Sequence, residues 1–172
     1  MDKTMLKNDF EKLRTHDKSA FIRIYNELKI PVYTIAYRIV GSREIAEDIT
    51  QEVFLKLYSS PPDADVKNPR AWIFTVARNL SIDHLRKQAI PNIDDVPETL
   101  EHHENDIITK LDVETALQTL STTEREIVTL HLNTGLSFKE ISYITKLSLP
   151  STYRRYKKAL SKLKTILSGG VL

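Results

Sequence analysis

LSFKEISYITKLSLPSTYRRYKKAL, residues 136–160, contains two helical patterns separated by a short polar turn. Ser137 and Glu140 have the spacing of a capping box, which predicts the start of a short helix with isoleucines on its buried side. Ser148 can cap the second helix, because Pro150 is tolerated in a first helical turn. Two capped helices joined by a tight turn predict a helix-turn-helix.

The second of these helices separates its residue types by side. An inward stripe is predicted from Leu149, Thr152, Tyr156, Leu160, Leu163 and Leu167. Another side carries Ser151, Arg154, Arg155, Lys158 and Lys162. In a helix-turn-helix, the first side chains of the second helix contact base edges, and later cations contact phosphates. The pattern favours a DNA reader over a merely solvated basic helix.

Composition predicts an all-α protein. The 172 residues can form one ordinary domain or two small ones, and four glycines are too few for many tight hairpins. The absence of cysteine excludes disulfides and thiolate metal sites. The N-terminus lacks a signal-peptide pattern, and no apolar run approaches a membrane span, so we expect a cytoplasmic protein. We also expect no cofactor and no metal.

Charge divides the chain into three parts of alternating sign. Residues 1–88 carry 15 Lys and Arg against 12 Asp and Glu, residues 89–120 carry 1 against 8, and residues 121–172 carry 9 against 3. The basic C-terminal part indicates a polyanionic partner or a solvated basic surface.

The middle of the chain has the composition of a linker. Residues 89–107, AIPNIDDVPETLEHHENDI, contain two prolines and mostly acids, with too few apolar positions for a buried face. We therefore expect two helical domains, residues 1–88 and 109–172, joined by a flexible acidic linker over residues 89–108. A long loop inside one domain is the alternative.

The N-terminal part has several helical patterns. Pro31 predicts a restart of the chain, Gly41 a helix end and Ser42 an N-cap. The next helix has an apolar stripe of Ile45, Ala46, Ile49, Val53, Phe54 and Leu57. Its other face carries Glu47, Asp48, Gln51 and Glu52. That face is either solvated or a protein-docking surface.

Prolines in residues 59–69 predict a loop, and a helix follows over residues 70–88. Its predicted buried side is Ile73, Val76, Ala77, Leu80 and Leu85, and its polar stripe is Thr75, Asn79, Asp83 and Arg86. Trp72 and Phe74 lie near Arg70 and Arg78. Such residues can stack on unpaired bases and hold phosphates, or the aromatic rings can belong to the core.

After the linker, Thr123 and Glu126 have the spacing of a capping box. The helix that they predict carries Ile127, Val128, Leu130 and Leu132 and ends near Gly135.

Three segments carry a family resemblance over almost the whole chain. EIAEDITQEVFLKLY (44–58) and NPRAWIFTVARNLSIDHLRK (68–87) resemble region 2 of bacterial sigma factors of the sigma-70 family, in the extracytoplasmic-function (ECF) group. LSTTEREIVTLHLNTGLSFKEISYITKLS (120–148) resembles the start of region 4 of that group. The group's architecture is two helical domains and a linker.

The resemblance implies partners and residue roles. Asp48, Gln51 and Glu52 match the part of region 2 that docks on the β′ clamp helices of core RNA polymerase. The loop before the 70–88 helix, together with Arg70, Trp72, Arg78, Asn79, Asp83 and Arg86, matches the elements that recognise and melt the −10 promoter element. The residues that match the −35 contacts are Ser151, Tyr153, Arg154, Arg155, Lys157 and Lys158. The β flap of the polymerase and an anti-sigma factor are further implied partners.

The chain departs from the family pattern in the second helix of the helix-turn-helix. The family usually has a glycine-containing VGTVKSRL-like run where this chain has LPSTYRRYKKAL. The −35 sequence preference therefore does not carry over, and the residues alone leave open whether Tyr156 packs inward or approaches DNA.

Two other classes of function are weighed against the initiation factor. A stand-alone helix-turn-helix regulator would bind duplex DNA without polymerase, but it does not account for the motifs in residues 44–87. An enzyme has little support, because the chain contains no HExxH, P-loop, G-x-S-x-G or cysteine nucleophile. His102 and His103 are adjacent, and we assign them to the linker instead of a metal site.

Overall fold

The computed structural model describes residues 3–88 and 108–168, which form eight helices and no strand. The predicted all-α class is confirmed. The chain divides into two compact units between Pro91 and Asn92, and each unit is described separately. That division falls within the predicted linker, which lies outside the described residues except for Ile108, the first residue of a helix.

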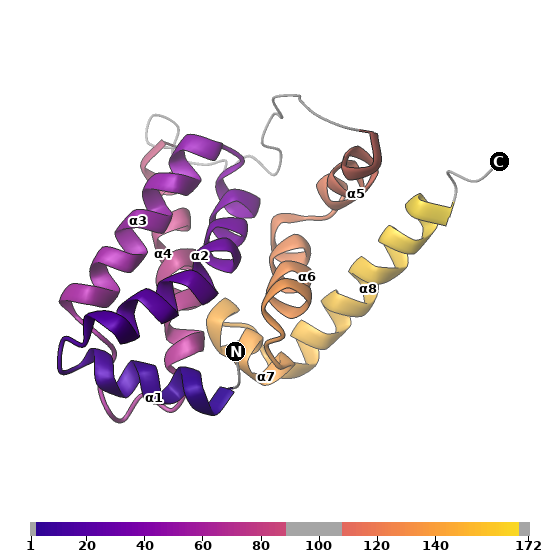
Figure 1. Ribbon diagram of the computed structural model, residues 1–172. Helices are drawn as coiled ribbons and strands as arrows, with labels where there is room; N and C mark the ends of the chain where they lie inside the picture. Colours follow the sequence, from indigo (N-terminus) through magenta and orange to yellow (C-terminus); the bar gives the residue numbers. More distant parts are fainter. Residues whose placement is uncertain (1–2, 89–107, 169–172) are drawn as a thin grey trace. The chain divides into compact units, whose positions relative to one another are not determined.

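The N-terminal unit contains α1 (Lys3–Leu13), α2 (Lys18–Val40), α3 (Arg43–Ser59) and α4 (Pro69–Gln88). Helix α2 packs against the other three helices, and α4 also contacts α1 and α3 (Figure 1). The largest fully buried side chains between them are Phe10, Leu13, Ile24, Leu28, Ile35, Leu57, Ile73 and Phe74. Phe74 is therefore a core residue, the second of the two interpretations that its sequence position allowed.

Local capping fixes the predicted boundary between α2 and α3. Gly41 adopts a left-handed conformation with φ of 75°, and its N–H donates to the carbonyl of Tyr37. Ser42 then accepts a hydrogen bond from the N–H of Ile45 at the start of α3. Both predictions from sequence are confirmed.

The predicted restart at Pro31 is wrong, because α2 runs through this residue. A proline inside a helix removes one hydrogen bond and costs about 3 kcal/mol. The helix continues because five residues beyond the proline are buried against the rest of the unit: Val32, Ile35, Ala36, Ile39 and Val40. Full burial of a Val or Ile side chain contributes about 1.5–3 kcal/mol, so their packing outweighs the local penalty.

The C-terminal unit contains α5 (Ile108–Gln118), α6 (Thr122–Thr134), α7 (Phe138–Thr145) and α8 (Leu149–Ser168). Helix α8 packs against the three others, and α6 also contacts α7 (Figure 1). Ala159 on α8 is fully buried with Leu120 and Val128, and Leu117, Tyr156 and Leu163 pack around this cluster. This packing holds the middle of α8 against the rest of the unit.

The capping box of α6 lies two residues earlier than predicted. Ser121 and Glu124 form it, whereas Glu126 is 5% exposed inside the helix. Both pairs have the required spacing, so the sequence pattern alone does not distinguish them. Gly135 ends α6 in a left-handed conformation, as predicted, and Leu132 is 62% exposed.

No helix in the described ranges combines the length and the apolar character that crossing a membrane requires.

Candidate nucleic-acid interface

The helix-turn-helix predicted from residues 136–160 is confirmed as α7, a turn and α8. The N–H of Ser137 donates to the Glu140 carboxylate at 2.6 Å, and the N–H of Glu140 donates to the Ser137 hydroxyl at 3.3 Å. Lys146 ends α7 in a left-handed conformation with φ of 57°. Ser148 then caps α8, accepting from the N–H of Ser151 at 3.3 Å. These bonds fix the direction in which α8 leaves the turn.

The N-terminal half of α8 presents an aromatic ring and cations to solvent. Tyr153 is 48% exposed, and Arg154, Lys157 and Lys158 are exposed. The Lys157 ammonium lies 5.7 Å from the centre of the Tyr153 ring. Ser151 and Arg155 are half-buried. The six residues of the predicted −35 set thus share one half of one helix, with four of them exposed.

Tyr156 packs inward, which answers the question that the sequence left open. Its ring centre lies 4.9 Å from the rings of both His131 and Phe138. Phe138 in turn lies 5.3 Å from Tyr153. Tyr153 therefore packs on an aromatic cluster of His131, Phe138 and Tyr156. Sequence reasoning missed this cluster because its members come from three helices.

The two ends of the predicted inward stripe on α8 are wrong. Leu149 is 47% exposed and Leu167 is 46% exposed, whereas Thr152 is fully buried as expected. Leu149 lies in the first turn of α8 and Leu167 in its last turn, whereas the buried Thr152 and Ala159 lie further inside the helix.

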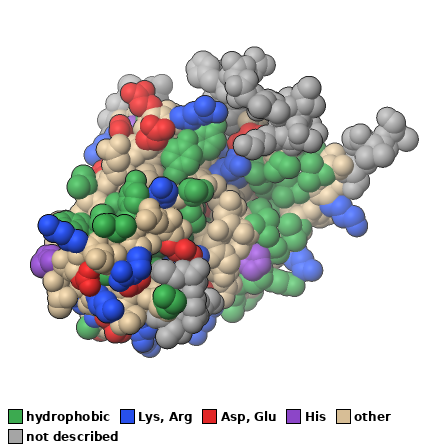
Figure 2. Space-filling view, in the orientation of Figure 1, with side chains coloured by type: hydrophobic (Ala, Val, Ile, Leu, Met, Phe, Trp, Pro, Cys, Tyr) green, Lys and Arg blue, Asp and Glu red, His purple; other side chains and the backbone are tan. Residues whose placement is uncertain are grey.

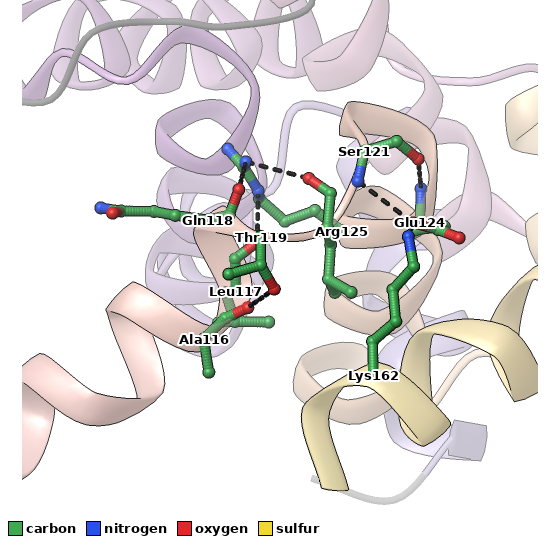
Figure 3. Close-up of polar contacts among 9 residues, drawn as sticks. Ala116, Leu117, Gln118, Thr119, Ser121, Glu124, Arg125 and Lys162 are labelled. Atoms are coloured by element: carbon green, nitrogen blue, oxygen red, sulfur yellow. Dashed lines mark hydrogen bonds and ion pairs between the residues drawn. The ribbon is translucent and has the colours of Figure 1, made fainter. Parts of the chain in front are cut away.

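Lys162, predicted on the cationic side of α8, forms an ion pair inside the unit. Its ammonium donates to the Glu124 carboxylate at 2.7 Å, and Glu124 is also the capping-box residue of α6 (Figure 3). Burial raises the pKa of Glu124, but the Lys162 ammonium and the Ser121 backbone N–H together hold this pKa below its usual value. Lys162 is thus paired with a carboxylate of the same unit.

Arg125 stabilises the corner before α6. Its guanidinium donates to the carbonyls of Leu117, Gln118 and Leu120 at 3.0, 3.2 and 3.2 Å (Figure 3). The Leu117 and Gln118 carbonyls lie at the end of α5, where helix carbonyls lack an intrahelical partner, and the Leu120 carbonyl lies in the turn before α6. Arg125 and the Glu124–Lys162 pair therefore join α5, α6 and α8 around one corner.

In the N-terminal unit, α4 presents the candidate −10 residues. Asn79, Asp83 and Arg86 are exposed, and the Arg86 guanidinium lies 3.8 Å from the Asp83 carboxylate. Arg70, Trp72 and Arg78 are half-buried. The Nε atom of Arg70 is buried with no hydrogen-bond partner in the described residues. The second half of α4 thus exposes the polar side chains of Asn79, Asp83 and Arg86, whereas Arg70 and Trp72 are partly covered at its start.

The candidate docking residues lie on the outer side of α3. Asp48, Gln51 and Glu52 are all exposed, and Glu52 pairs with Lys56 at 3.1 Å. Leu55, which is 69% exposed, follows Gln51 by one helical turn. The space-filling view shows hydrophobic side chains interspersed with acidic and basic ones on the visible face of this unit (Figure 2). Sequence reasoning did not include Leu55 in this face.

Comparisons with known proteins agree with the two-unit division. Residues 24–90 match the model of Sigma-70 region 2, and residues 110–163 match that of Sigma-70, region 4. The chain is 33% identical over 85 residues to the ECF RNA polymerase sigma factor SigW of Bacillus subtilis, a match covering 49% of this chain and 46% of SigW. It is 25% identical over 164 residues to SigK of Mycobacterium tuberculosis, a match covering 88% of each protein.

Two solved structures have the same fold. The sigma factor RpoE of Bartonella quintana, solved with the anti-sigma factor NepR, has a TM-score of 0.69 and 20% identity, covering 86% of this chain and 96% of RpoE. CnrH, solved with the cytosolic domain of CnrY, has a TM-score of 0.64 and 18% identity, covering 98% of this chain and 97% of CnrH. With both regions matched in order, the chain belongs to the sigma-70 family, as a sigma factor of the ECF type.

Proposed function

We propose that this protein directs core RNA polymerase to specific promoters and assists their melting during transcription initiation. The observation that carries the proposal is the helix-turn-helix of the C-terminal unit, whose capped α8 exposes Tyr153, Arg154, Lys157 and Lys158. The match of residues 24–90 to Sigma-70 region 2 supports the proposal, because the N-terminal unit then supplies a second module of a sigma factor.

The first role proposed is docking on core polymerase. Asp48, Gln51 and Glu52 would contact the β′ clamp helices, since all three are exposed on one side of α3. Charged and amide side chains at the rim of an interface determine orientation and association rate more than raw affinity. The C-terminal unit would contact the β flap.

The second role is capture of the −10 element. Arg70, Trp72, Arg78, Asn79, Asp83 and Arg86 would hold unpaired bases and the adjoining phosphates along α4. Stacking of a base on an aromatic side chain contributes about 1–3 kcal/mol, so binding of exposed bases can supply part of the energy of strand opening. No covalent chemistry is needed for this step.

The third role is recognition of the −35 element. Ser151, Tyr153 and Arg154 would face base edges, and Arg155, Lys157 and Lys158 would add contacts to bases or phosphates. The position of these residues in the first half of the second helix is the one that helix-turn-helix proteins place in the major groove. Phosphate contacts would make this binding salt-dependent.

An anti-sigma factor is the regulatory partner that we propose. RpoE and CnrH, which have the same fold, were each solved with a second protein: an anti-sigma factor for RpoE and a cytosolic domain for CnrH. Such a partner would compete with polymerase for this chain.

Run-off transcription with core RNA polymerase and genomic promoter fragments, with and without the protein, tests the proposal. Discrete new start sites that require the protein are expected, and aligned starts would reveal both promoter elements. If no new starts appear while the protein alone binds duplex DNA tightly, the stand-alone regulator would replace this proposal.

A further inference from the structure

Arg14 joins the end of α1 to the loop between α3 and α4. Its Nε donates to the carbonyl of Pro62 at 2.9 Å, and its Nη2 donates to the carbonyl of Asp63 at 2.9 Å. The residues of each pair are 48 and 49 positions apart in the chain. Because the guanidinium is planar and its donors are fixed, two bonds to consecutive carbonyls determine the direction of the loop backbone as well as its distance.

The turn between α1 and α2 brings Arg14 to this loop. His16 adopts a left-handed conformation with φ of 58°, which reverses the chain before Asp17 caps α2. The ring of Tyr58, in the last turn of α3, lies 6.2 Å from His16 and 5.2 Å from Phe21. The start of the loop therefore packs next to the turn that carries Arg14.

The loop is fixed at its base and exposed at its tip. Pro62 is buried, the N–H of Val66 donates to the Asp63 carbonyl at 3.1 Å, and Asn68 caps α4 by accepting from the N–H of Ala71 at 3.0 Å. Beyond Pro62, the exposed positions are Asp63, Ala64, Asp65 and Lys67. Both ends of the exposed segment are thus held, one by Arg14 and one by Asn68.

We infer that Arg14 is a positioning residue for capture of −10 bases, which it performs by holding the 60–68 loop in its binding conformation before DNA arrives. The inference rests on the proposed function, in which this loop and α4 receive unpaired bases. A loop that is already ordered loses less conformational entropy on binding, so each base contact retains more of its free energy. Arg14 lies outside every element that the family motifs in the sequence identify.

The hydrogen bonds of Arg14 favour this positioning role over a direct contact between Arg14 and DNA. Two guanidinium nitrogens are already used by the carbonyls of Pro62 and Asp63, and the side chain is half-buried. Lysine at this position would keep the positive charge but would lack the two-pronged donor geometry. Arg14→Lys therefore distinguishes positioning from attraction of phosphates.

The experiment uses holoenzyme assembled from core polymerase and the full chain carrying Arg14→Lys or Arg14→Ala. The probe is a fluorescent single-stranded oligonucleotide with the non-template −10 sequence of a promoter mapped by run-off transcription. Both variants should bind it about tenfold more weakly, because each loses the paired hydrogen bonds, while affinity for core polymerase is unchanged. Lys12→Ala, which removes an exposed cation from the same helix end, is the matched control and should bind normally.

A second measurement follows the loop itself. Hydrogen exchange at the amides of residues 63–67 should become faster in Arg14→Lys, with exchange in α2 and α3 unchanged. Normal oligonucleotide binding by Arg14→Lys, or an equal loss of core affinity and oligonucleotide binding, would overturn the inference. Failure of the wild-type holoenzyme to bind the oligonucleotide would instead contradict the proposed function.

Discussion

The Lys162 ammonium lies 2.7 Å from the Glu124 carboxylate, so one ion pair joins the second half of α8 to the first turn of α6. The side chain of Glu124 is 4% exposed and that of Lys162 is 37% exposed. The same carboxylate oxygen also accepts the N–H of Ser121 at 3.1 Å. A single buried carboxylate therefore supports both the start of α6 and the position of α8.

Replacing Lys162 with methionine should destabilise the C-terminal unit. The variant keeps most of the aliphatic stem but leaves the Glu124 carboxylate buried without its cation, at a cost of about 1–2 kcal/mol after allowance for the partial exposure of Lys162. Urea unfolding followed by circular dichroism measures this loss. Lys164→Met changes an exposed lysine on the same helix and should have little effect. Equal destabilisation by both variants would mean that the ion pair contributes nothing.

Acid should weaken the protein partly through Glu124. Its pKa is lower in the folded state than in the unfolded chain, because the Lys162 and Ser121 interactions outweigh the effect of burial. The unfolded state then binds the proton more tightly. The stabilisation is therefore present above the ordinary carboxylate pKa and is lost as pH falls through the lowered one.

The measurement is the free energy of unfolding of wild type and Glu124→Gln between pH 7 and pH 3. The difference between the two proteins should shrink as the solution becomes more acidic. Asp17, whose pKa the backbone N–H groups of Ala20 and Ser19 lower, adds an acid-sensitive contribution in the N-terminal unit of both proteins. A difference that stays constant over the whole range would contradict the role assigned to Glu124.

Arg154→Ala should weaken transcription that depends on the −35 element. Arg154 is exposed at the end of α8 that enters the groove in helix-turn-helix proteins, and loss of a bidentate contact with a base reduces binding about tenfold or more. Run-off transcription by holoenzyme on promoters with intact and scrambled −35 elements measures this loss of transcription. The defect should disappear on the scrambled promoter. Lys164→Ala, on the same helix outside the predicted contacts, provides the control.

Asp48→Ala should reduce affinity for core RNA polymerase while leaving protein stability unchanged. The carboxylate is exposed on α3, so its removal creates no cavity. Competition against a labelled wild-type chain for core polymerase measures the affinity, and a loss of several-fold is expected from one interface charge. Glu11→Ala, an exposed carboxylate on α1, is the matched control. Core binding equal to wild type would remove Asp48 from the docking surface.

Local patterns were sufficient wherever a structural element depends on neighbours in the chain. The caps at Ser42, Ser137 and Ser148 and the helix end at Gly135 follow from residues within one helical turn, and all were predictable. The family motifs likewise reside in continuous segments, so the resemblance to regions 2 and 4 could be read directly. The assignment of individual residues to polymerase, −10 and −35 contacts stays a prediction.

The sequence by itself determined the all-α class and the helix-turn-helix, because helical periodicity and capping are short-range properties. Tertiary structure decided the outcome at positions where the local signals allowed more than one structure. Burial of the residues after Pro31 kept α2 continuous, and contact with Lys162 accompanies the choice of Glu124 over Glu126 as the capping residue. The inward packing of Tyr156 and the bonds from Arg14 to the 60–68 loop join segments far apart in the chain. No periodicity encodes such pairs, since their free energy exists only after the helices have packed.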